Sequence, residues 1–277
     1  MALIVPEVYS SLVREKIAGR VIMMNLAKDL GEIPQFANIG DTIVFPKWKL
    51  IGDAEVMVKG TPLTPDALAQ DSSSATITQV GKAVRVFDID AVTALGTHVE
   101  EAGEQTAMKI AKKIDDDLIV EAKTTPLKQA GSAATAITAD DIENALQYFG
   151  DEIDTEDFAG VVINSRLIKS VMSMAEFVDR TKVTSAEFNG VVRKGLLGFY
   201  RMVPIYVSDK GTYDTTTQEC ISFIVKKGAL GFKLKKGLNV EEEREAKLKA
   251  TDICADEIYA VKLINDAGVV MIKKTLV

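Results

Sequence analysis

The chain has 277 residues, of which 47% are apolar, and this is ample material for one large domain or two of ordinary size. Its 33 basic and 40 acidic residues leave a net charge of −7, with an isoelectric point near 5.0. This acidic balance excludes a general nucleic-acid-binding protein, because such a protein needs an excess of positive charge to contact phosphates.

The cysteines and the first residues of the chain indicate the cellular compartment in which the protein is made. Cys220 and Cys254 are far apart, so they predict no disulfide framework and favour a reducing cytoplasm. The opening MALIVP lacks the basic flank and the length of a signal peptide, and no apolar run approaches the length of a membrane span. We therefore expect a soluble protein that is made inside the cell.

The start of the chain is expected to form an apolar arm. Pro6 suits a helix N-terminus, and a loose helical stripe of apolar residues continues up to Gly31. Such an arm needs a neighbouring surface to cover it. From the residues alone, docking on the chain's own core is the favoured interpretation. The stripe consists of Val8, Leu12, Ile17, Val21 and Met24.

Two β-rich runs follow, at residues 40–48 and 76–88. Pro46 confines the first of them to a sheet edge or a strand end, because proline cannot donate to a strand ladder. Between the runs, glycines, prolines and the serines of residues 72–74 predict turns and open loop. Two strands joined by a long polar tip predict a hairpin-like projection. A mobile surface loop is the alternative, but loops this long are uncommon in compact domains and usually have a function.

Residues 97–124 predict one long helix. They contain no proline, and apolar or small side chains recur four residues apart along one face, as in a helix laid on a core. Pro126 stops the helix, and Asp115 and Asp116 are expected to lie off the stripe in solvent. At 1.5 Å per residue the helix would be roughly 40 Å long, which favours a scaffold over a pocket. The stripe contains Ala102, Thr106, Ile110, Ile114, Leu118 and Ala122.

The second half of the chain predicts an α/β module. A helix is expected from Thr138 to Gly150, with a capping pattern that ends at Asp141. It is followed by apolar runs typical of buried strands and by a short helix at residues 165–174. Two long extended stretches and a final strand close the chain. The expected strands are 158–164, 202–207, 221–225, 230–234, 239–249, 251–264 and 269–276.

No reactive group of residues emerges. His98 is the only histidine, so neither a histidine-rich zinc site nor a Ser-His-Asp triad can be assembled. The acidic run at residues 115–117 could hold a hard cation only with a facing partner, and a solvated helix face is the favoured interpretation. We therefore assign no catalytic residue, no cofactor-binding residue and no metal ligand, and we expect no cofactor and no enzyme activity.

A lysine-rich segment, residues 226–237, looks only superficially like a phosphate-binding loop. It lacks the Gly-Lys-Ser/Thr ending, and no helix follows to supply an N-terminus. Its lysines are expected to pair with the acidic run at residues 241–243, within or between subunits. A weak nucleic-acid contact is the alternative.

Several phrases, taken in order, carry a family resemblance. PEVYSSLV, GDTIVFPKW, IGDAE, VGKAVRVFDID, IAKKIDDDLI, FAGVVINSR, VPIYVSD, KKGALGF, NVEEERE and DEIYAVKL span nearly the whole chain. Together they resemble the major capsid proteins of tailed bacteriophages and related prophages. The resemblance implies an α+β fold that is shared with encapsulin nanocompartments and herpesvirus capsid floors.

The resemblance also implies a division of the chain. An N-terminal arm is expected at residues 1–38 and an extended β loop at residues 39–88. A peripheral domain with a long spine helix follows at 89–132, and an axial α/β domain at 133–236. Residues 237–277 are expected to supply peripheral strands and a final strand that returns to the axial domain. On this plan Ile110, Ile114 and Leu118 should pack against the strands that begin near Asn239 and Thr251.

The function implied is self-assembly into an icosahedral phage or prophage head that encloses double-stranded DNA, and the alternative is an encapsulin-type shell around protein cargo. The implied partners are further copies in pentamers and hexamers, a separate scaffolding protein, a portal, an optional decoration protein and packaged DNA in weak contact. No membrane is involved. The expected location is the virion, with assembly in the bacterial cytoplasm. Because nothing identifies a crosslinking chemistry, Lys47, Lys49 and Lys59 receive no catalytic role.

Overall fold

The structure is a computed structural model, and it describes residues 21–34, 37–48, 51–52, 54, 56–57, 65–93, 98–151, 154–178 and 195–276. Most of the predicted N-terminal arm lies outside these residues, and so do Lys49 and Lys59. No helix in the described ranges is long and apolar enough to cross a membrane.

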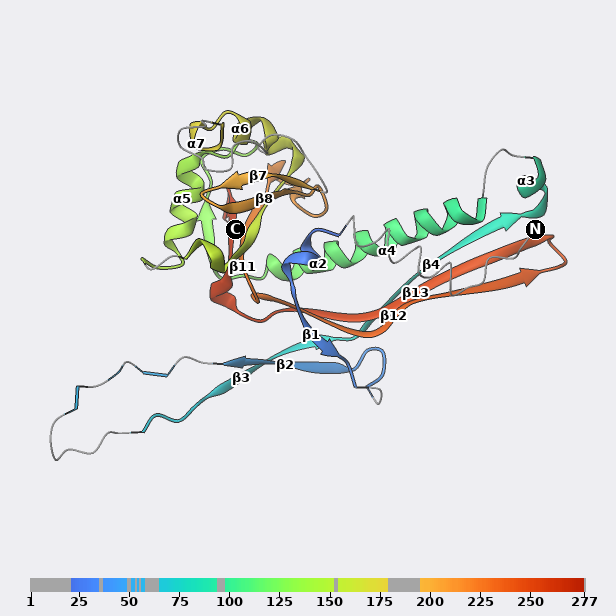
Figure 1. Cartoon of the computed structure of the whole chain (residues 1–277), viewed down its shortest axis with the longest axis horizontal. Helices are drawn as coiled ribbons and strands as arrows, with labels where there is room; N and C mark the ends of the chain where they lie inside the picture. The colour runs from blue at the N-terminus through green and yellow to red at the C-terminus, as the bar shows by residue number, and fades with distance from the viewer. Residues whose placement is uncertain are drawn as a thin grey trace.

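A long four-stranded sheet, in the order β1-β12-β13-β4, forms the central feature. Strands β12 (Leu230–Glu245) and β13 (Ala250–Leu263) are antiparallel neighbours and exceed the usual strand length. β4 (Thr78–Phe87) pairs antiparallel with β13, and β1 (Lys28–Glu32) adds parallel to β12. Helix α4 (His98–Ala122) lies along one face of this sheet (Figure 1).

Helix α4 confirms the helix predicted for residues 97–124. Its predicted stripe is buried and shares one core with inward-facing side chains of β12 and β13, among them Val240 and Ile253. The predicted packing of Ile110, Ile114 and Leu118 against these strands is confirmed. Burying such side chains stabilises the fold by about 1.5–3 kcal/mol each. The buried residues of α4 include Ala102, Thr106, Ala107, Ile110, Ala111, Ile114, Asp115, Leu118, Ile119 and Ala122.

A second, six-stranded sheet lies at one end of α4, in the order β5-β14-β11-β6-β8-β7 (Figure 1). It carries its own core, which helix α5 (Ala139–Gln147) helps to cover. Thr138 caps α5 with the predicted capping box, in which its side chain accepts from the Asp141 N–H. The strands are β5 (Lys128–Ala130), β6 (Phe158–Ile163), β7 (Leu196–Tyr200), β8 (Val203–Val207), β11 (Ser222–Lys226) and β14 (Val269–Lys273).

Short elements complete this end of the molecule. They are the helices α6 (Ile168–Met172) and α7 (Ala175–Val178), the 3-10 turns η1 (Thr155–Asp157), η2 (Ser165–Leu167) and η4 (Asp266–Gly268), and the small pair β9 (Tyr213–Asp214) and β10 (Glu219–Cys220). Elsewhere, α2 (Met23–Leu26) precedes β1, and α3 (Asp88–Thr93) follows β4 at the far end of the long sheet.

A two-stranded hairpin projects from the long sheet, with β2 (Thr42–Trp48) paired to β3 (Gln70–Thr76) (Figure 1). Its base has a small core of its own, in which Phe45 and Ile77 pack with Ile258 and Ala260 of β13. Because side chains alternate along β13, Ile258 and Ala260 face away from α4. The hairpin therefore projects from the face of the sheet opposite the helix.

Four sequence predictions were wrong in detail. The partner of residues 42–48 is β3 and not the run at 76–88, which joins β13 in the long sheet. The serines of residues 72–74, predicted as open loop, are therefore strand. The helical stripe does not continue to Gly31, because α2 ends at Leu26 and residues 28–32 form β1. The stretches at 230–234 and 239–249 are largely one strand, β12.

Candidate functional site

Few groups in the described ranges could perform chemistry. No cluster of three or more histidine, cysteine or acidic residues is placed to hold a metal ion there. His98 is the first residue of α4, Cys220 is buried and Cys254 is exposed. The lysine-rich segment contains a turn at Gly228 between β11 and β12, which belong to different sheets, so it has no helix N-terminus to bind a phosphate. These residues therefore form no common site, and the polar contacts that matter here are structural.

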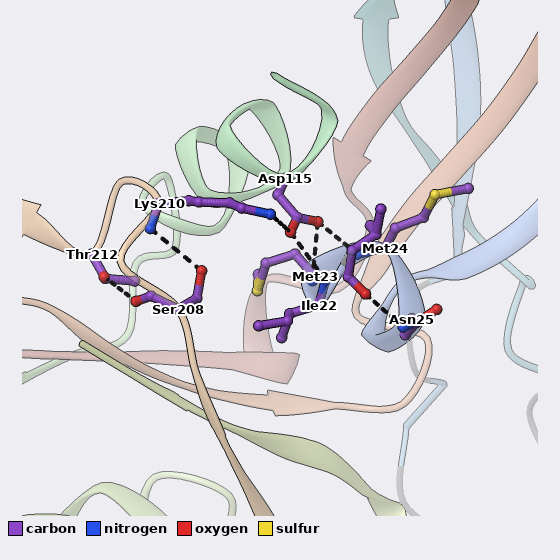
Figure 2. A network of polar contacts seen from close by, with 9 residues as sticks. Ile22, Met23, Met24, Asn25, Asp115, Ser208, Lys210 and Thr212 are labelled. Carbon is purple, nitrogen blue, oxygen red and sulfur yellow. Dashed lines mark hydrogen bonds and ion pairs between the residues drawn. The ribbon is translucent and has the colours of Figure 1, made fainter. Parts of the chain in front are cut away.

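Asp115 is the centre of a buried polar network (Figure 2). Its side chain is 0% exposed and points from α4 toward the start of α2. Oδ1 accepts from the backbone N–H groups of Met23 and Met24 at 3.1 and 3.3 Å, and Oδ2 accepts from that of Ile22 at 3.0 Å. The first N–H groups of a helix have no partner within the helix, and Ile22 has no side chain that could cap them. Asp115 therefore caps α2 from a neighbouring element.

Lys210 approaches the same carboxylate from the other side. Its Nζ lies 2.9 Å from Asp115 Oδ2, and its side chain is mostly buried. Lys210 belongs to the loop between β8 and β9, where Thr212 donates to the Ser208 carbonyl and Ser208 N–H donates to Ile163 O at 2.9 Å. The Asp115 carboxylate thus connects three parts of the chain: the N-terminal segment, the long helix and the six-stranded sheet.

Close backbone approaches hold the same three parts together. Gly211 has φ +66° and lies so near Ile119 that an added Cβ would be 3.0 Å from its side chain. Gly195 has φ +83°, and a Cβ there would come within 2.7 Å of Ile22. Only glycine fits both positions without strain. The sequence interpretation of Asp115 as a solvated residue was therefore wrong, and the junction around it is tightly packed.

The other two acidic residues of the run behave differently. Burial raises the pKa of the Asp116 carboxyl above its usual range. Asp117 accepts a hydrogen bond from the Tyr259 hydroxyl at 2.8 Å and pairs with Lys113 one turn earlier. Burial and this hydrogen bond raise the pKa of Tyr259. Asp115 therefore caps α2, Asp116 is half-exposed, and Asp117 connects α4 to β13.

The predicted pairing of the lysine-rich segment with residues 241–243 does not occur within one subunit among the described residues, and pairing between subunits stays a prediction. Lys233, Lys235 and Lys236 lie on β12 with the acidic run, so the run follows them on one strand and does not face them. Lys236 pairs with Asp256 at 3.5 Å, whereas the ammonium groups of Lys226 and Lys233 lie over aromatic rings. The ring beneath Lys233 is that of Phe45, in the base of the β2–β3 hairpin.

The hairpin β2–β3 is fixed at its base and apolar toward its tip. Lys47 forms an ion pair with Asp266, which anchors β2 beside η4. Beyond the strands, the apolar side chains of Ile51, Val56, Met57 and Leu68 are exposed, and Val56 is 91% exposed. Isolated exposed apolar residues are ordinary, but several on one projection indicate a surface that another molecule covers. This projection is the candidate functional site.

The comparisons with known proteins agree with this arrangement. The chain is 23% identical over 272 residues to a protein named major capsid protein of Staphylococcus phage phiMR11, covering 98% of this chain and 93% of the other. The capsid of cyanophage P-SCSP1u superposes with a TM-score of 0.64, at 17% identity, over 91% of this chain and 88% of that one. A virus-like particle from Pyrococcus furiosus superposes with a TM-score of 0.63, at 13% identity, over 96% of this chain and 98% of that one. No family model matches the chain.

These similarities extend over the whole chain and not over one module. They confirm at the level of fold what the sequence phrases predicted. The described elements are those of the α+β fold found in these particle-forming proteins.

Proposed function

We propose that this chain, which has the fold of tailed-phage major capsid proteins, is the coat protein of a phage or prophage head. Many copies close into an icosahedral shell that encloses double-stranded DNA. The observation that supports this most strongly is the projecting hairpin, whose exposed apolar tip lies away from all three cores of its own chain. A monomer has no use for such a projection, whereas a shell subunit buries it against a neighbour.

The proposal assigns a role to each part of the chain. The six-stranded sheet with its helices corresponds to the axial domain at residues 133–236, although its strand β5 precedes that range and its strand β14 follows it. Helix α4 with the long sheet is the peripheral domain. Residues 1–38 form the arm and residues 39–88 the extended loop, although β4 at the end of that range lies in the long sheet. β12 enters the long sheet at Leu230, slightly before the proposed boundary at residue 237.

The proposed partners follow from the same role. Copies of the chain form pentamers and hexamers, and scaffolding, portal and decoration proteins are separate chains. The role is structural and needs no catalysis. Assembly takes place in the bacterial cytoplasm and ends in the virion. The net charge of −7 per subunit keeps packaged DNA from adhering to the wall, because like charges repel.

The first prediction is assembly itself. Purified protein, alone or with a scaffolding protein, should sediment as capsomers or closed particles. Particles isolated from cells that express the complete head genes should contain DNA that is protected from nuclease. A chain that stays monomeric at high concentration under all these conditions would contradict the proposal. Particles filled with protein and devoid of DNA would favour the nanocompartment alternative.

The second prediction concerns the hairpin tip. Changing Val56→Ser and Met57→Ser together should leave the free energy of unfolding of the dissociated subunit within about 0.5 kcal/mol, because both side chains are exposed. The yield of closed particles should fall sharply, because the tip loses its apolar contact. Particle yield is measured by sedimentation, and stability by denaturant titration.

A matched control replaces two exposed polar residues of the same hairpin, Gln70→Ser and Ser72→Thr, and should assemble normally. A shorter tip gives a further variant. Gly52 N–H donates to Asp66 Oδ2 at 2.9 Å, so the chain can be rejoined there after deletion of residues 53–65. This variant should fold and fail to close shells. Normal particle yields from both tip variants would show that the tip is not an assembly element.

A further inference from the structure

The far end of the long sheet carries a second exposed apolar surface, distinct from the hairpin tip. Leu248, in the turn between β12 and β13, is 49% exposed. Phe87, at the end of β4, is exposed beside it, because Phe87 pairs in register with Ala250. Lys247 and Lys249 flank Leu248 and are exposed. We name these four residues, Phe87, Lys247, Leu248 and Lys249, the distal tip.

The distal tip is held firmly by its own chain. The Arg244 guanidinium donates to both oxygens of Asp88, at 2.6 and 2.5 Å. Asp88 N–H donates to Lys249 O at 2.9 Å, and Leu248 N–H donates to Glu245 O at 3.1 Å. These bonds fix the turn and the end of β4 relative to each other. A surface ordered in advance loses little conformational entropy when a partner binds to it.

A groove on the face of the long sheet opposite α4 has the complementary character. It has a volume of about 570 Å³, and its lining includes Gly81, which has no side chain, and the small side chains of Ala83 and Cys254. Glu241 and Asp256 also line it, together with Gln79, Lys82, Lys236 and Ala255. Glu243 lies two residues along β12 from Glu241 and therefore on the same face. The groove is wide enough for an apolar side chain and has carboxylates at its border.

Two carboxylates on this face, those of Glu241 and Glu243, lie outside the close ion pairs, although Glu243 still interacts with Arg85 at longer range. Arg85 pairs with Asp252 at 2.7 Å and with Glu245 at 2.9 Å, and Lys236 pairs with Asp256. In the part of the chain that the structure describes, Glu241 and Glu243 form no ion pair; Glu241 only accepts a hydrogen bond from Asn239 at 2.7 Å. Two lysines flank the apolar side chain of the distal tip, so their charge is opposite to that of Glu241 and Glu243 beside the groove.

We propose that the distal tip of one subunit docks into the groove of a second copy of this chain. Leu248 enters the space above Gly81, Ala83 and Cys254, and Lys247 and Lys249 pair with Glu241 and Glu243. The contact is heterologous, because two different surfaces meet, and such contacts generate closed rings or extended lattices. The inference rests on the proposed self-assembly and names one of its contact surfaces.

Cys254 provides a direct test, because it is exposed and lines the groove. In particles of the Leu248→Cys variant, mild oxidation should join subunits through a disulfide between the introduced thiol and Cys254 of a neighbouring copy. Covalent multimers should then appear on a non-reducing gel. The bond cannot form within one chain. Position 248 lies beyond residue 250, and residues 250 and 254 are already about 13 Å apart along β13. A disulfide needs Cα atoms within about 7 Å of each other.

Two controls accompany this variant. Leu248→Cys with Cys254→Ser should give no multimers, and neither should Thr217→Cys, which places a thiol at an exposed position far from the tip. Absence of multimers from assembled Leu248→Cys particles would overturn the inference. Multimers of the variant that also carries Cys254→Ser would overturn it too, because the disulfide would then join two distal tips to each other. In either case wild-type particles would still support the proposed function.

A charge exchange provides a second measurement that does not depend on cysteine. Lys247→Glu with Lys249→Glu should lower particle yield by roughly tenfold at low salt, because like charges across an interface repel. Adding Glu241→Lys and Glu243→Lys in the same chain should restore the yield. The first variant should also recover in about 1 M salt, where charges are screened beyond about 3 Å. An unchanged yield for the first variant, or no recovery for the fourfold variant, would contradict the docking.

Discussion

Replacing Asp115 with alanine should lower the free energy of unfolding of the dissociated subunit by about 3–5 kcal/mol, the usual cost of removing one partner from a buried ion pair. The change takes the Asp115 carboxylate away from the largely buried Lys210 ammonium, and it removes the acceptors for three backbone N–H groups at the start of α2. Denaturant titration measures the loss. Proteins are stable by only about 5–15 kcal/mol, so we expect poor accumulation of the variant.

Two further variants separate the causes of this loss. Adding Lys210→Met to Asp115→Ala should recover part of the stability, because the ammonium that lost the Asp115 carboxylate is removed as well. The matched control is Asp116→Ala on the same turn. Because burial raises the pKa of Asp116, its charged form gains nothing from folding, and the change should be nearly silent. Equal stability of the Asp115 and Asp116 variants would show that the junction does not depend on the Asp115 carboxylate.

Replacing Ile114 with aspartate should have an effect at least as large. Ile114 is buried in the core between α4 and the long sheet, where truncation to alanine typically costs about 2–5 kcal/mol. Aspartate should cost more, because its charge would be buried without a partner. We expect the variant to be insoluble or to unfold well below the wild-type denaturant midpoint, as judged by expression and circular dichroism.

The matched control introduces the same residue on the exposed side of the same helix. Lys112 is exposed, so Lys112→Asp should change the free energy of unfolding by no more than about 0.5 kcal/mol. If Ile114→Asp folded as well as Lys112→Asp, α4 could not be packed against β12 and β13 as the structure shows.

The elements with strong periodicity were predictable from the sequence. The four-residue spacing of apolar side chains located α4 within one or two residues at each end, and Thr138 with Asp141 marked the start of α5. The buried strands of the six-stranded sheet were also found, because they are short apolar runs between turn residues. In each case the local pattern and the tertiary packing favour the same structure.

The pairing of the strands was not predictable. Nothing in residues 70–76, QDSSSAT, is typical of a strand, yet β3 forms because β2 supplies its backbone hydrogen bonds. The run at residues 78–87 has a strong strand pattern, but its partner, β13, lies more than 160 residues away in the sequence. Long-range pairing depends on the whole fold, whereas propensity acts locally.

The role of Asp115 was missed although a signal was present. Ala107, Ala111 and Ile119 form a second apolar row beside the predicted stripe, and Asp115 lies in that row, four residues from Ala111 and from Ile119. An acidic residue in a buried row of a helix predicts a specific partner, because an unpaired buried charge is too costly. Its particular partners, Lys210 and the start of α2, are set by tertiary structure.

Self-assembly into a closed shell is the central claim, and electron cryomicroscopy of the assembled protein tests it most directly. The account predicts icosahedral particles in which each subunit has the two sheets and the long helix described here, with the β2–β3 tip lying against a neighbouring subunit. A reconstruction in which the tip contacts only its own subunit, or micrographs that show only monomers under every assembly condition, would contradict the account.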